Sequence, residues 1–341
     1  MRDGLRVTII SALQGGDSHN SPQVLPGDFL PLPHMSLSLP EIQQLGHLEL
    51  LARQVVEGFI TGLHKSPFHG FSVEFAEHRL YNTGESTRHI DWKLFGRSDK
   101  LFVKRYEEET NLRCHLILDN SSSMHFPDEG KKQPLNKINF SVHCAAALAY
   151  MLRMQRDAVG MSIFSDKIEL NTQARSSSVH HKMLFAEMEK RIMDPKIQTG
   201  KKTAAASALH EIAETIHKRS LVIIFSDMME SAGDEDELFS ALQHLRHNKH
   251  EVVLFHVTDK KQEEEFSFVD RPYLFIDVES GEQVKVHSNE IRASYIEAMT
   301  AFKRNLKLRC AQYRIDFVEA DIHEGYRQVL LPYLLKRERM N

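Results

Sequence analysis

Beyond residue 110, short apolar runs alternate with stretches in which apolar residues recur every three or four positions. The runs, which predict strands, are His115–Leu118, Val159–Phe164, Leu221–Phe225, Val252–Val257 and Ile315–Val318. The stretches, which predict helices, are Ile138–Leu152, Met183–Ile192, Ala205–Ile216, Leu238–Leu245 and a terminal helix that includes Leu330 and Leu335. Strands that are apolar throughout and alternate with helices are typical of a parallel sheet covered on both faces. We therefore expect a doubly wound, mostly parallel α/β fold over residues 111–341.

Other segments stand apart from this alternation. Tyr273–Val278 and Gln283–Val286 alternate apolar and polar residues around a Ser-Gly turn, which predicts an inserted hairpin near residues 273–286. Residues 41–110 contain an amphipathic helix followed by short strands, and they predict a smaller N-terminal module. Residues 1–40 hold five of the 11 prolines, which disfavour helices and central strands, so we expect a flexible or peripheral arm there.

Composition and charge narrow the class of protein. With 341 residues, of which 41% are hydrophobic and 26% charged, the chain has the composition of a soluble globular protein with a sizeable core. Lys and Arg total 43 against 47 Asp and Glu, and this lack of a basic excess predicts no nucleic-acid partner. No apolar run approaches the roughly 18 residues of a membrane span, so we expect none.

The cysteines and the N-terminus bear on location. Cys114, Cys144 and Cys310 are odd in number and widely separated, which predicts free thiols rather than a disulfide framework. The N-terminal apolar run, Val7–Leu13, has no small-residue cleavage motif soon after it, so we expect no signal peptide. Together these features predict a cytoplasmic protein.

Oxygen-bearing side chains follow two of the predicted strands. Asp119, Ser121 and Ser123 come directly after the first strand, Asp227 follows the strand Leu221–Phe225, and Thr203 begins a predicted helix. Ligands of open α/β sheets bind at the carboxyl ends of the strands, so we expect these side chains to converge. Carboxylate and hydroxyl oxygens suit a hard cation, and nearby helix N-termini would favour an incoming anion. The five residues therefore predict a site for Mg²⁺ or Mn²⁺ with one position left for water or a partner's carboxylate.

This set resembles the metal-ion-dependent adhesion site of von Willebrand factor A domains. The preceding segment contains the strings Glu77-His78-Arg79-Leu80-Tyr81 and Arg88-His89-Ile90-Asp91-Trp92-Lys93. With these strings the chain resembles the bacterial domain-of-unknown-function family 58, whose members carry an A-type domain after such a segment. The resemblance implies a von Willebrand factor A-like, Rossmann-type domain over residues 111–341. Because family members are commonly encoded beside MoxR-type AAA+ ATPases, it also implies such a partner, in chaperone-like or metal-insertion work.

Three alternatives remain open at this stage. Where A domains usually carry a Gly-Gly-Thr loop, this chain has Gly200-Lys201-Lys202-Thr203, so Thr199 competes with Thr203 as a ligand. The hydroxyls could instead only cap a strand-to-helix turn, which would leave a structural module. The same oxygen cluster could also serve a metal-dependent phosphoesterase, with His89 or His125 as acid or base.

We expect a non-enzymatic protein-interaction module, because the usual catalytic strings are missing. The chain has no Gly-x-Ser-x-Gly elbow, no Walker-type loop and no Gly-x-Gly-x-x-Gly fingerprint.

Further expectations concern side chains outside the oxygen-bearing set. Trp92, the only tryptophan, is expected to anchor a core. The charges around it are expected to tie the small module to the larger domain or to form plain solvated surface, and a protein-binding surface is the alternative. The acidic run Glu263–Glu265 is expected to be a solvated loop.

Overall fold

The structure is a computed structural model. It describes residues 47–60, 72–82, 87, 90–109, 112–127, 135–193, 205–229, 235–276 and 283–340. The arm expected at residues 1–40 lies outside the described residues.

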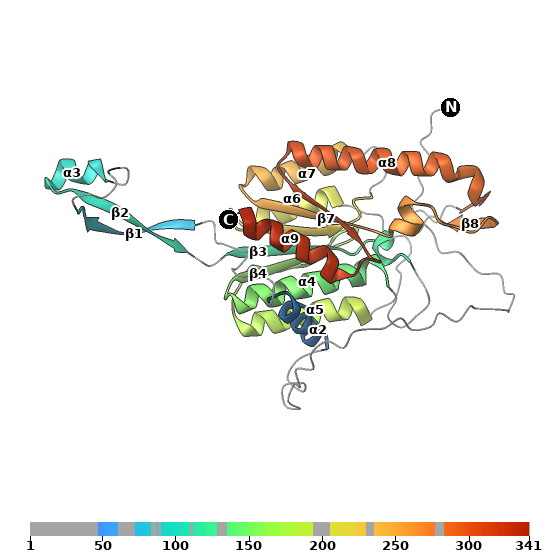
Figure 1. The fold of residues 1–341 in the computed structure, drawn as a ribbon, viewed down its shortest axis with the longest axis horizontal. Coiled ribbons are helices and arrows are strands. Elements are labelled where there is room, and N and C mark those ends of the chain that lie inside the picture. The colour runs from blue at the N-terminus through green and yellow to red at the C-terminus, as the bar shows by residue number, and fades with distance from the viewer. Residues whose placement is uncertain are drawn as a thin grey trace.

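A six-stranded sheet forms the centre of the molecule (Figure 1). In spatial order its strands are β10 (Asp316–Asp321), β7 (Glu251–Thr258), β6 (Leu221–Ser226), β3 (Arg113–Asp119), β4 (Ala158–Phe164) and β5 (Ile168–Asn171). All neighbouring pairs are parallel except the last, in which the edge strand β5 runs antiparallel to β4. The mostly parallel sheet is confirmed. The four-residue strand β5 was not predicted, because it is only partly buried and follows β4 without an intervening helix.

Helices cover both faces of this sheet (Figure 1). One face carries α2 (His47–Ile60), α4 (Lys137–Met154), α5 (Ser178–Met193) and α9 (Tyr326–Met340). The other carries α6 (Ala205–Thr215), α7 (Glu235–His247) and α8 (Ser288–Gln312). Side chains alternate along a strand, so Ile223 of β6 enters the first core cluster while Val222 and Ile224 enter the second. This two-sided burial explains why the strands are apolar throughout.

The residues expected to form one module at 41–110 occupy two different places. Helix α2 packs on the body, because Leu48, Ala52 and Val56 are buried in the core cluster beside α4. Strands β1 (Ser72–Leu80) and β2 (Phe102–Glu109) instead form an antiparallel ribbon that projects away from the body (Figure 1). A short helix, α3 (Trp92–Ser98), lies at the far end of this ribbon.

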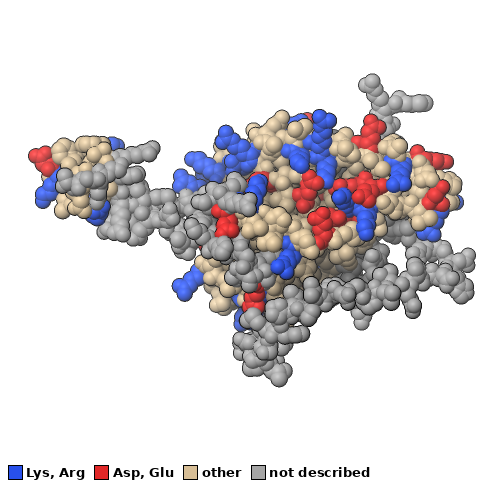
Figure 2. All heavy atoms as spheres, viewed as in Figure 1, with Lys and Arg blue, Asp and Glu red and all other residues tan. Residues whose placement is uncertain are grey.

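The expectation that Trp92 anchors a core is wrong, because its side chain is 62% exposed. Asp91 caps α3 by accepting hydrogen bonds from the backbone N–H groups of Lys93 and Leu94, so the helix is well formed, but none of its residues is buried. A helix at the end of a two-stranded ribbon has no second layer against which to bury a tryptophan. Lys93 and Arg97 of α3 are exposed at this far end, as expected of solvated surface, whereas the side chains of residues 104–109 lie outside the described ones. Figure 2 shows the charges at this end of the ribbon apart from the body.

The predicted inserted hairpin is present as β8 (Pro272–Ile276) and β9 (Gln283–His287). Its aromatic side chains join a separate cluster with residues from outside the hairpin. The buried members of this cluster are Phe126, Phe266, Tyr273, Phe275 and Tyr295. The hairpin therefore packs against the beginning of α8 and the segment after β7.

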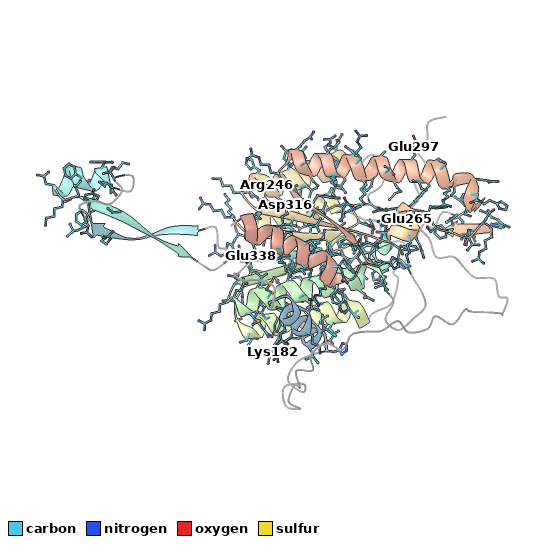
Figure 3. All side chains as sticks on the ribbon, in the orientation of Figure 1. Lys182, Arg246, Glu265, Glu297, Asp316 and Glu338 are labelled. Atoms are coloured by element: carbon cyan, nitrogen blue, oxygen red, sulfur yellow. The ribbon has the colours of Figure 1, made fainter. Side chains whose placement is uncertain are left out.

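The near balance of acidic and basic residues in the composition is also seen on the surface. Charged side chains such as Lys182 and Glu297 point outward (Figure 3), and both signs of charge are interspersed on the visible face of the body (Figure 2). Among the described helices, none combines the length with the apolarity that a membrane span requires. Cys114, Cys144 and Cys310 are buried free thiols, as predicted.

Candidate functional site

Asp119 is the last residue of β3, and both oxygens of its fully buried carboxylate accept hydrogen bonds. The backbone N–H of Ser121 donates to Oδ1 at 2.8 Å, and the hydroxyl of Ser226 donates to Oδ2 at 2.6 Å. Ser226 ends the neighbouring strand β6, and the parallel register pairs Leu118 with Phe225. The two strands therefore end side by side, which places Ser226 beside Asp119.

Ser121 and Ser123 lie in the turn that follows β3, where the 3-10 helix η2 (Ser122–His125) begins. Their hydroxyl oxygens are 3.1 Å apart, and both side chains are buried. Ser121 also hydrogen-bonds Asp119 through its side chain, and the hydroxyl of Ser123 donates to Asp227. The two serines thus link the two aspartates in one continuous set of hydrogen bonds.

Asp227 follows β6 directly and is fully buried. Its Oδ1 accepts a hydrogen bond from the backbone N–H of Met229 at 3.1 Å, and its Oδ2 accepts one from Lys137 Nζ at 2.7 Å. The intervening Met228 has a φ of 54°, a left-handed conformation that turns the chain sharply after the strand. This turn directs the Asp227 side chain back toward the end of the sheet.

The structure therefore brings together four of the five predicted site residues, Asp119, Ser121, Ser123 and Asp227. We call these four the oxygen cluster. Thr203 and its alternative Thr199 lie outside the described residues. The strand-end placement that motivated the prediction is the reason for the convergence, because β3 and β6 are adjacent and parallel.

Two charged residues of the site were missed. Lys137, the first residue of α4, is 0% exposed, and its Nζ donates to Asp227 Oδ2 and, at 2.5 Å, to Glu263 Oε1. Glu263 lies in the single π-helical turn η3 (Lys260–Glu264) that follows β7, and its Oε2 accepts from the backbone N–H of Asp259 at 2.8 Å. The expectation of a solvated acidic loop is wrong for Glu263, which is 1% exposed. The one sign of this arrangement in the sequence was the position of Lys137, directly before the apolar positions of the predicted helix Ile138–Leu152.

Burial and neighbouring charges shift the pKa values of these groups in opposite directions. Burial raises the pKa of Asp119 to about 7, and the negative charge of Asp227 adds to this rise. Burial also raises the pKa of Glu263 to about 7, although Lys137 opposes the rise. For Asp227 the effect of burial is outweighed by the charge and hydrogen bond of Lys137, which hold the pKa of this carboxyl below its usual value.

The charges do not cancel when all these groups are ionised. Asp119, Asp227 and Glu263 carry three negative charges and Lys137 carries one positive charge, all of them in the interior. Buried charge is costly unless it is paired, and the excess corresponds to the charge of one divalent cation. No three His, Cys, Asp or Glu side chains of the described chain are grouped so that they could hold a metal by themselves. A cation would therefore depend on the serine hydroxyls, and the mixed oxygen set fits a hard ion such as Mg²⁺.

The histidines proposed for the phosphoesterase alternative receive no specific support. His89 lies outside the described residues. His125 ends η2, and its Nε2 lies 3.1 Å from Asn120 Oδ1, which itself holds Glu169 through Nδ2. This contact engages the ring in a side-chain network rather than placing it as an acid or base on a substrate.

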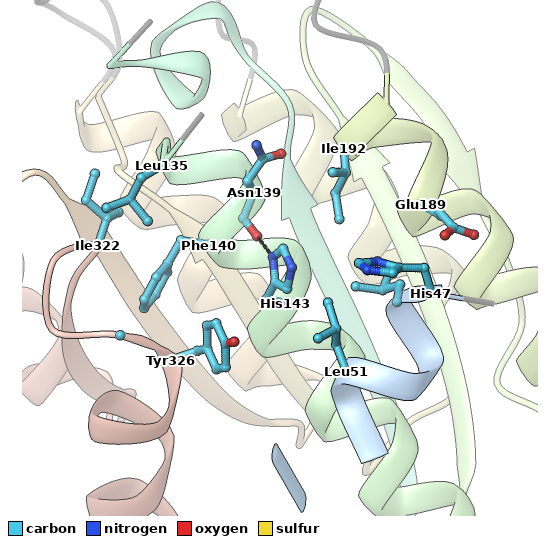
Figure 4. A pocket seen from close by; sticks show the side chains of 12 residues that line it. His47, Leu51, Leu135, Asn139, Phe140, His143, Glu189, Ile192, Ile322 and Tyr326 are labelled. Atoms are coloured by element: carbon cyan, nitrogen blue, oxygen red, sulfur yellow. Dashed lines mark hydrogen bonds between the residues drawn. The ribbon is translucent and has the colours of Figure 1, made fainter. Parts of the chain in front are cut away.

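A separate pocket of about 250 Å³ lies between α2, α4, α5 and the start of α9 (Figure 4). Its lining is mostly apolar, with Leu51, Phe140 and Ile322 among its walls. The ring of His143 stacks on that of Tyr326, and its Nδ1 lies 2.6 Å from the backbone oxygen of Asn139. None of the oxygen-cluster residues lines this pocket.

Comparison with known proteins shows which protein family this chain matches. The family model "Protein of unknown function DUF58" matches residues 77–305. The chain is 26% identical over 185 residues to the "Uncharacterized protein Rv1480" of Mycobacterium tuberculosis and to the "Uncharacterized protein Mb1516" of Mycobacterium bovis. These alignments cover 53% of this chain and 55% of each relative, so the chain spans about half the length of the curated relatives it matches.

Two solved structures show a distant likeness. One is the conserved hypothetical protein BatB from Bacteroides thetaiotaomicron, with 14% identity and a TM-score of 0.40 over 67% of this chain and 100% of that one. The other is an aerotolerance-related membrane protein from Bacteroides fragilis, with 14% identity and a TM-score of 0.41 over 68% of this chain and 100% of that one. At these TM-scores the two structures support no inference about this chain.

Proposed function

We propose a function for this chain from the premise that it belongs to the family described as protein of unknown function DUF58. The chain is a non-enzymatic protein-interaction module that binds a divalent cation, Mg²⁺ or Mn²⁺, at the carboxyl edge of its sheet. Asp119, Ser121, Ser123 and Asp227 hold the cation, and Thr203 completes the protein ligands.

One observation carries this proposal. Two aspartates that follow adjacent parallel strands are linked through the hydroxyls of Ser121 and Ser123, and all four side chains are buried together. When Asp119, Asp227 and Glu263 are all ionised, an excess of two buried negative charges remains once Lys137 is counted. Capping hydroxyls alone would not require two carboxylates to face each other in the interior.

The mostly parallel sheet with helices on both faces supports the finer assignment as a von Willebrand factor A-like, Rossmann-type domain. In such an arrangement the bound cation supplies a Lewis-acidic point that attracts an acidic side chain of a partner. Ser226 and the backbone N–H groups of Ser121 and Met229 hold the two aspartates in orientation. We further propose a MoxR-type AAA+ ATPase as the partner, in chaperone-like or metal-insertion work, on the ground of the family resemblance.

Calorimetric titration with Mn²⁺ and Mg²⁺ tests the cation site. The wild-type chain is expected to bind one ion, and Asp119→Asn is expected to lose this binding while it stays folded. The matched control is Asp157→Asn. Asp157 is also buried and accepts a hydrogen bond from the backbone N–H of Leu112 at 2.8 Å, but it lies at the opposite edge of the sheet. It is therefore expected to keep cation binding.

The partner is tested separately, with a purified MoxR-type ATPase. Binding is expected to weaken when the cation is removed by a chelator and when Asp119 is replaced by Asn. Unchanged partner affinity in Asp119→Asn would count against the proposed function even if the chain binds Mn²⁺.

A further inference from the structure

Lys137 occupies an unusual position for a lysine, because its whole side chain is 0% exposed. Its ammonium group lies between two carboxylates, with Nζ 2.7 Å from Asp227 Oδ2 and 2.5 Å from Glu263 Oε1. The three residues belong to elements far apart in the sequence, namely the start of α4, the end of β6 and the turn η3. The ammonium is therefore built into the interior by the fold and is not a mobile surface charge.

The placement has an electrostatic consequence for the oxygen cluster. A buried ammonium is tolerated only when it is paired and hydrogen-bonded, and Lys137 satisfies this condition with Asp227 and Glu263. One oxygen of Asp227 is thereby already engaged by a positive charge of the protein itself. A second cation that approached Asp227 would have to share this carboxylate and would be repelled by the ammonium.

We propose that Lys137 is an internal counter-ion of the oxygen cluster, which holds Asp227 in place without a metal and competes with a divalent cation for the Asp227 carboxylate. The inference rests on the proposed function and deepens it. Lys137 lowers the affinity of the site for the cation and makes the fold independent of cation binding. The cation therefore binds reversibly to a site that is already folded, and the chain does not need the cation in order to fold.

Glu263 tunes this competition. It draws the ammonium partly away from Asp227, because Nζ donates to both carboxylates. Replacing Glu263 by the neutral Gln leaves Lys137 paired with Asp227 alone and lowers the local negative charge by one. Replacing Lys137 by the neutral Met raises the local negative charge by one and leaves Asp227 free to serve as a ligand. The two substitutions are thus expected to change cation affinity in opposite directions.

The experiment measures Mn²⁺ binding by calorimetry and thermal unfolding with and without Mn²⁺ in the full chain. Lys137→Met is expected to bind Mn²⁺ at least about tenfold more tightly than wild type, because a positive charge next to the site is removed. Its melting temperature without Mn²⁺ is expected to fall, and Mn²⁺ is expected to raise it by more than in wild type. Glu263→Gln is expected to bind Mn²⁺ more weakly than wild type.

The matched control is Arg337→Met. Arg337 is 7% exposed and pairs with Glu251 at the first residue of β7, on the edge of the sheet away from the oxygen cluster. This variant also loses a buried ion pair, so its melting temperature is expected to fall. Its affinity for Mn²⁺ is expected to equal that of wild type.

The outcomes separate this inference from the proposed function. If wild type binds Mn²⁺ but Lys137→Met binds it equally or more weakly, the counter-ion inference is overturned and the metal site stands. If Lys137→Met does not fold without Mn²⁺, the weaker binding expected of Glu263→Gln carries the test, and equal or tighter binding there overturns the inference. If wild type, Lys137→Met and Glu263→Gln all fail to bind Mn²⁺, the proposed cation site and the inference both fall. If only Lys137→Met binds Mn²⁺, the counter-ion inference is supported and the proposed function of the natural chain fails.

Discussion

The hydroxyl of Ser226 donates a hydrogen bond to Asp119 Oδ2 at 2.6 Å and so joins the ends of β6 and β3. The Ser226 hydroxyl oxygen in turn accepts a hydrogen bond from the backbone N–H of Met228 at 2.9 Å. One small side chain thus orients the first aspartate of the oxygen cluster and shapes the turn that leads into the second. Ser226 was not among the predicted site residues, although it directly precedes Asp227.

Replacing Ser226 by Ala is expected to lower both stability and Mn²⁺ affinity. A hydrogen bond to a buried charged group contributes about 2 kcal/mol, so the free energy of unfolding is expected to fall by about that amount. Chemical denaturation and calorimetry measure the two effects. The control is Ser220→Ala. Ser220 is also buried next to β6, but its hydroxyl donates to the backbone oxygen of His217 at the other end of the strand. A loss of Mn²⁺ affinity in the control as large as in Ser226→Ala would contradict this prediction.

The central sheet and the meeting of the aspartates were predictable because they depend on local patterns. Strands buried on both faces are apolar throughout, and a polar residue after such a strand must lie at the edge of the sheet. The long helix α8 was missed because only four of its 25 residues are buried, namely Ser288, Tyr295, Leu306 and Cys310. So sparse a pattern gives almost no helical periodicity in the sequence.

The charges of the site were not predictable in the same way. Lys137 and Glu263 are 126 residues apart, and their contact depends on where the π-helical turn after β7 lies in space. No local pattern marks an acidic residue as the one of three that turns inward. The prediction that Trp92 anchors a core was wrong for a different reason. A lone tryptophan indicates a core by its size and apolarity, yet Trp92 is exposed because its ribbon projects beyond any second layer.

Replacing Gly160 by Ala is expected to destabilise the body. A Cβ at this position in β4 would lie 2.7 Å from His115 Nδ1 and 2.9 Å from the backbone atoms Ala174 N and Thr172 O. Two of these three atoms are backbone and cannot move aside cheaply, so we expect a loss of roughly 1–3 kcal/mol or more in the free energy of unfolding. Chemical denaturation measures the loss.

The matched control for this substitution is Gly96→Ala. Gly96 lies in α3 and its Cβ would meet nothing within 4 Å, so Ala is accommodated and only adds helix propensity to the end of the ribbon. The free energy of unfolding of the body is expected to stay unchanged. Equal stability of Gly160→Ala and wild type would contradict the packing described for β3 and β4.

The exposure of Trp92 predicts the fluorescence of the whole chain, because it is the only tryptophan. A neutral quencher in water is expected to reach it almost as efficiently in the native protein as in the unfolded one. Trp92→Ala is expected to change the free energy of unfolding by less than about 0.5 kcal/mol, as for an exposed residue without a structural role. Poor quenching in the native state, together with a large loss of stability in the variant, would mean that the tryptophan is buried after all.

The raised pKa values predict how stability depends on pH when no divalent cation is present. Asp119 and Glu263 have ordinary pKa values of 3.8 and 4.5, and each is raised to about 7 in the folded chain, chiefly by burial. Between these values the folded state holds protons that the unfolded state has released, so stability must fall as pH rises. Asp227 has a lowered pKa, so the stability that its charge contributes is lost only in more acidic solution. We therefore expect these two carboxyls to contribute a decrease in the free energy of unfolding from about pH 5 to pH 7 that levels off above that range. The buried side chains of His115, His181 and His256 oppose this contribution, because burial lowers their pKa values to about 3 or 4.

Denaturation in urea over a series of pH values measures how stability depends on pH, and the difference between wild type and Asp119→Asn isolates the contribution of the Asp119 carboxyl. Each fully shifted group contributes at most about 1.4 kcal/mol per pH unit, so removing the Asp119 carboxyl is expected to reduce the slope by up to that amount. Asp157 also has a pKa raised to about 7 by burial, and Asp157→Asn is expected to reduce the slope as well. Only Asp119, however, is a cation ligand in the proposed site. With Mn²⁺ present, the wild-type chain and Asp157→Asn should therefore become more stable toward pH 8, because deprotonation creates the ligand, whereas Asp119→Asn should not respond. A pH profile of Asp119→Asn that coincides with wild type under both conditions would show that this carboxyl is neither the titrating group nor the ligand.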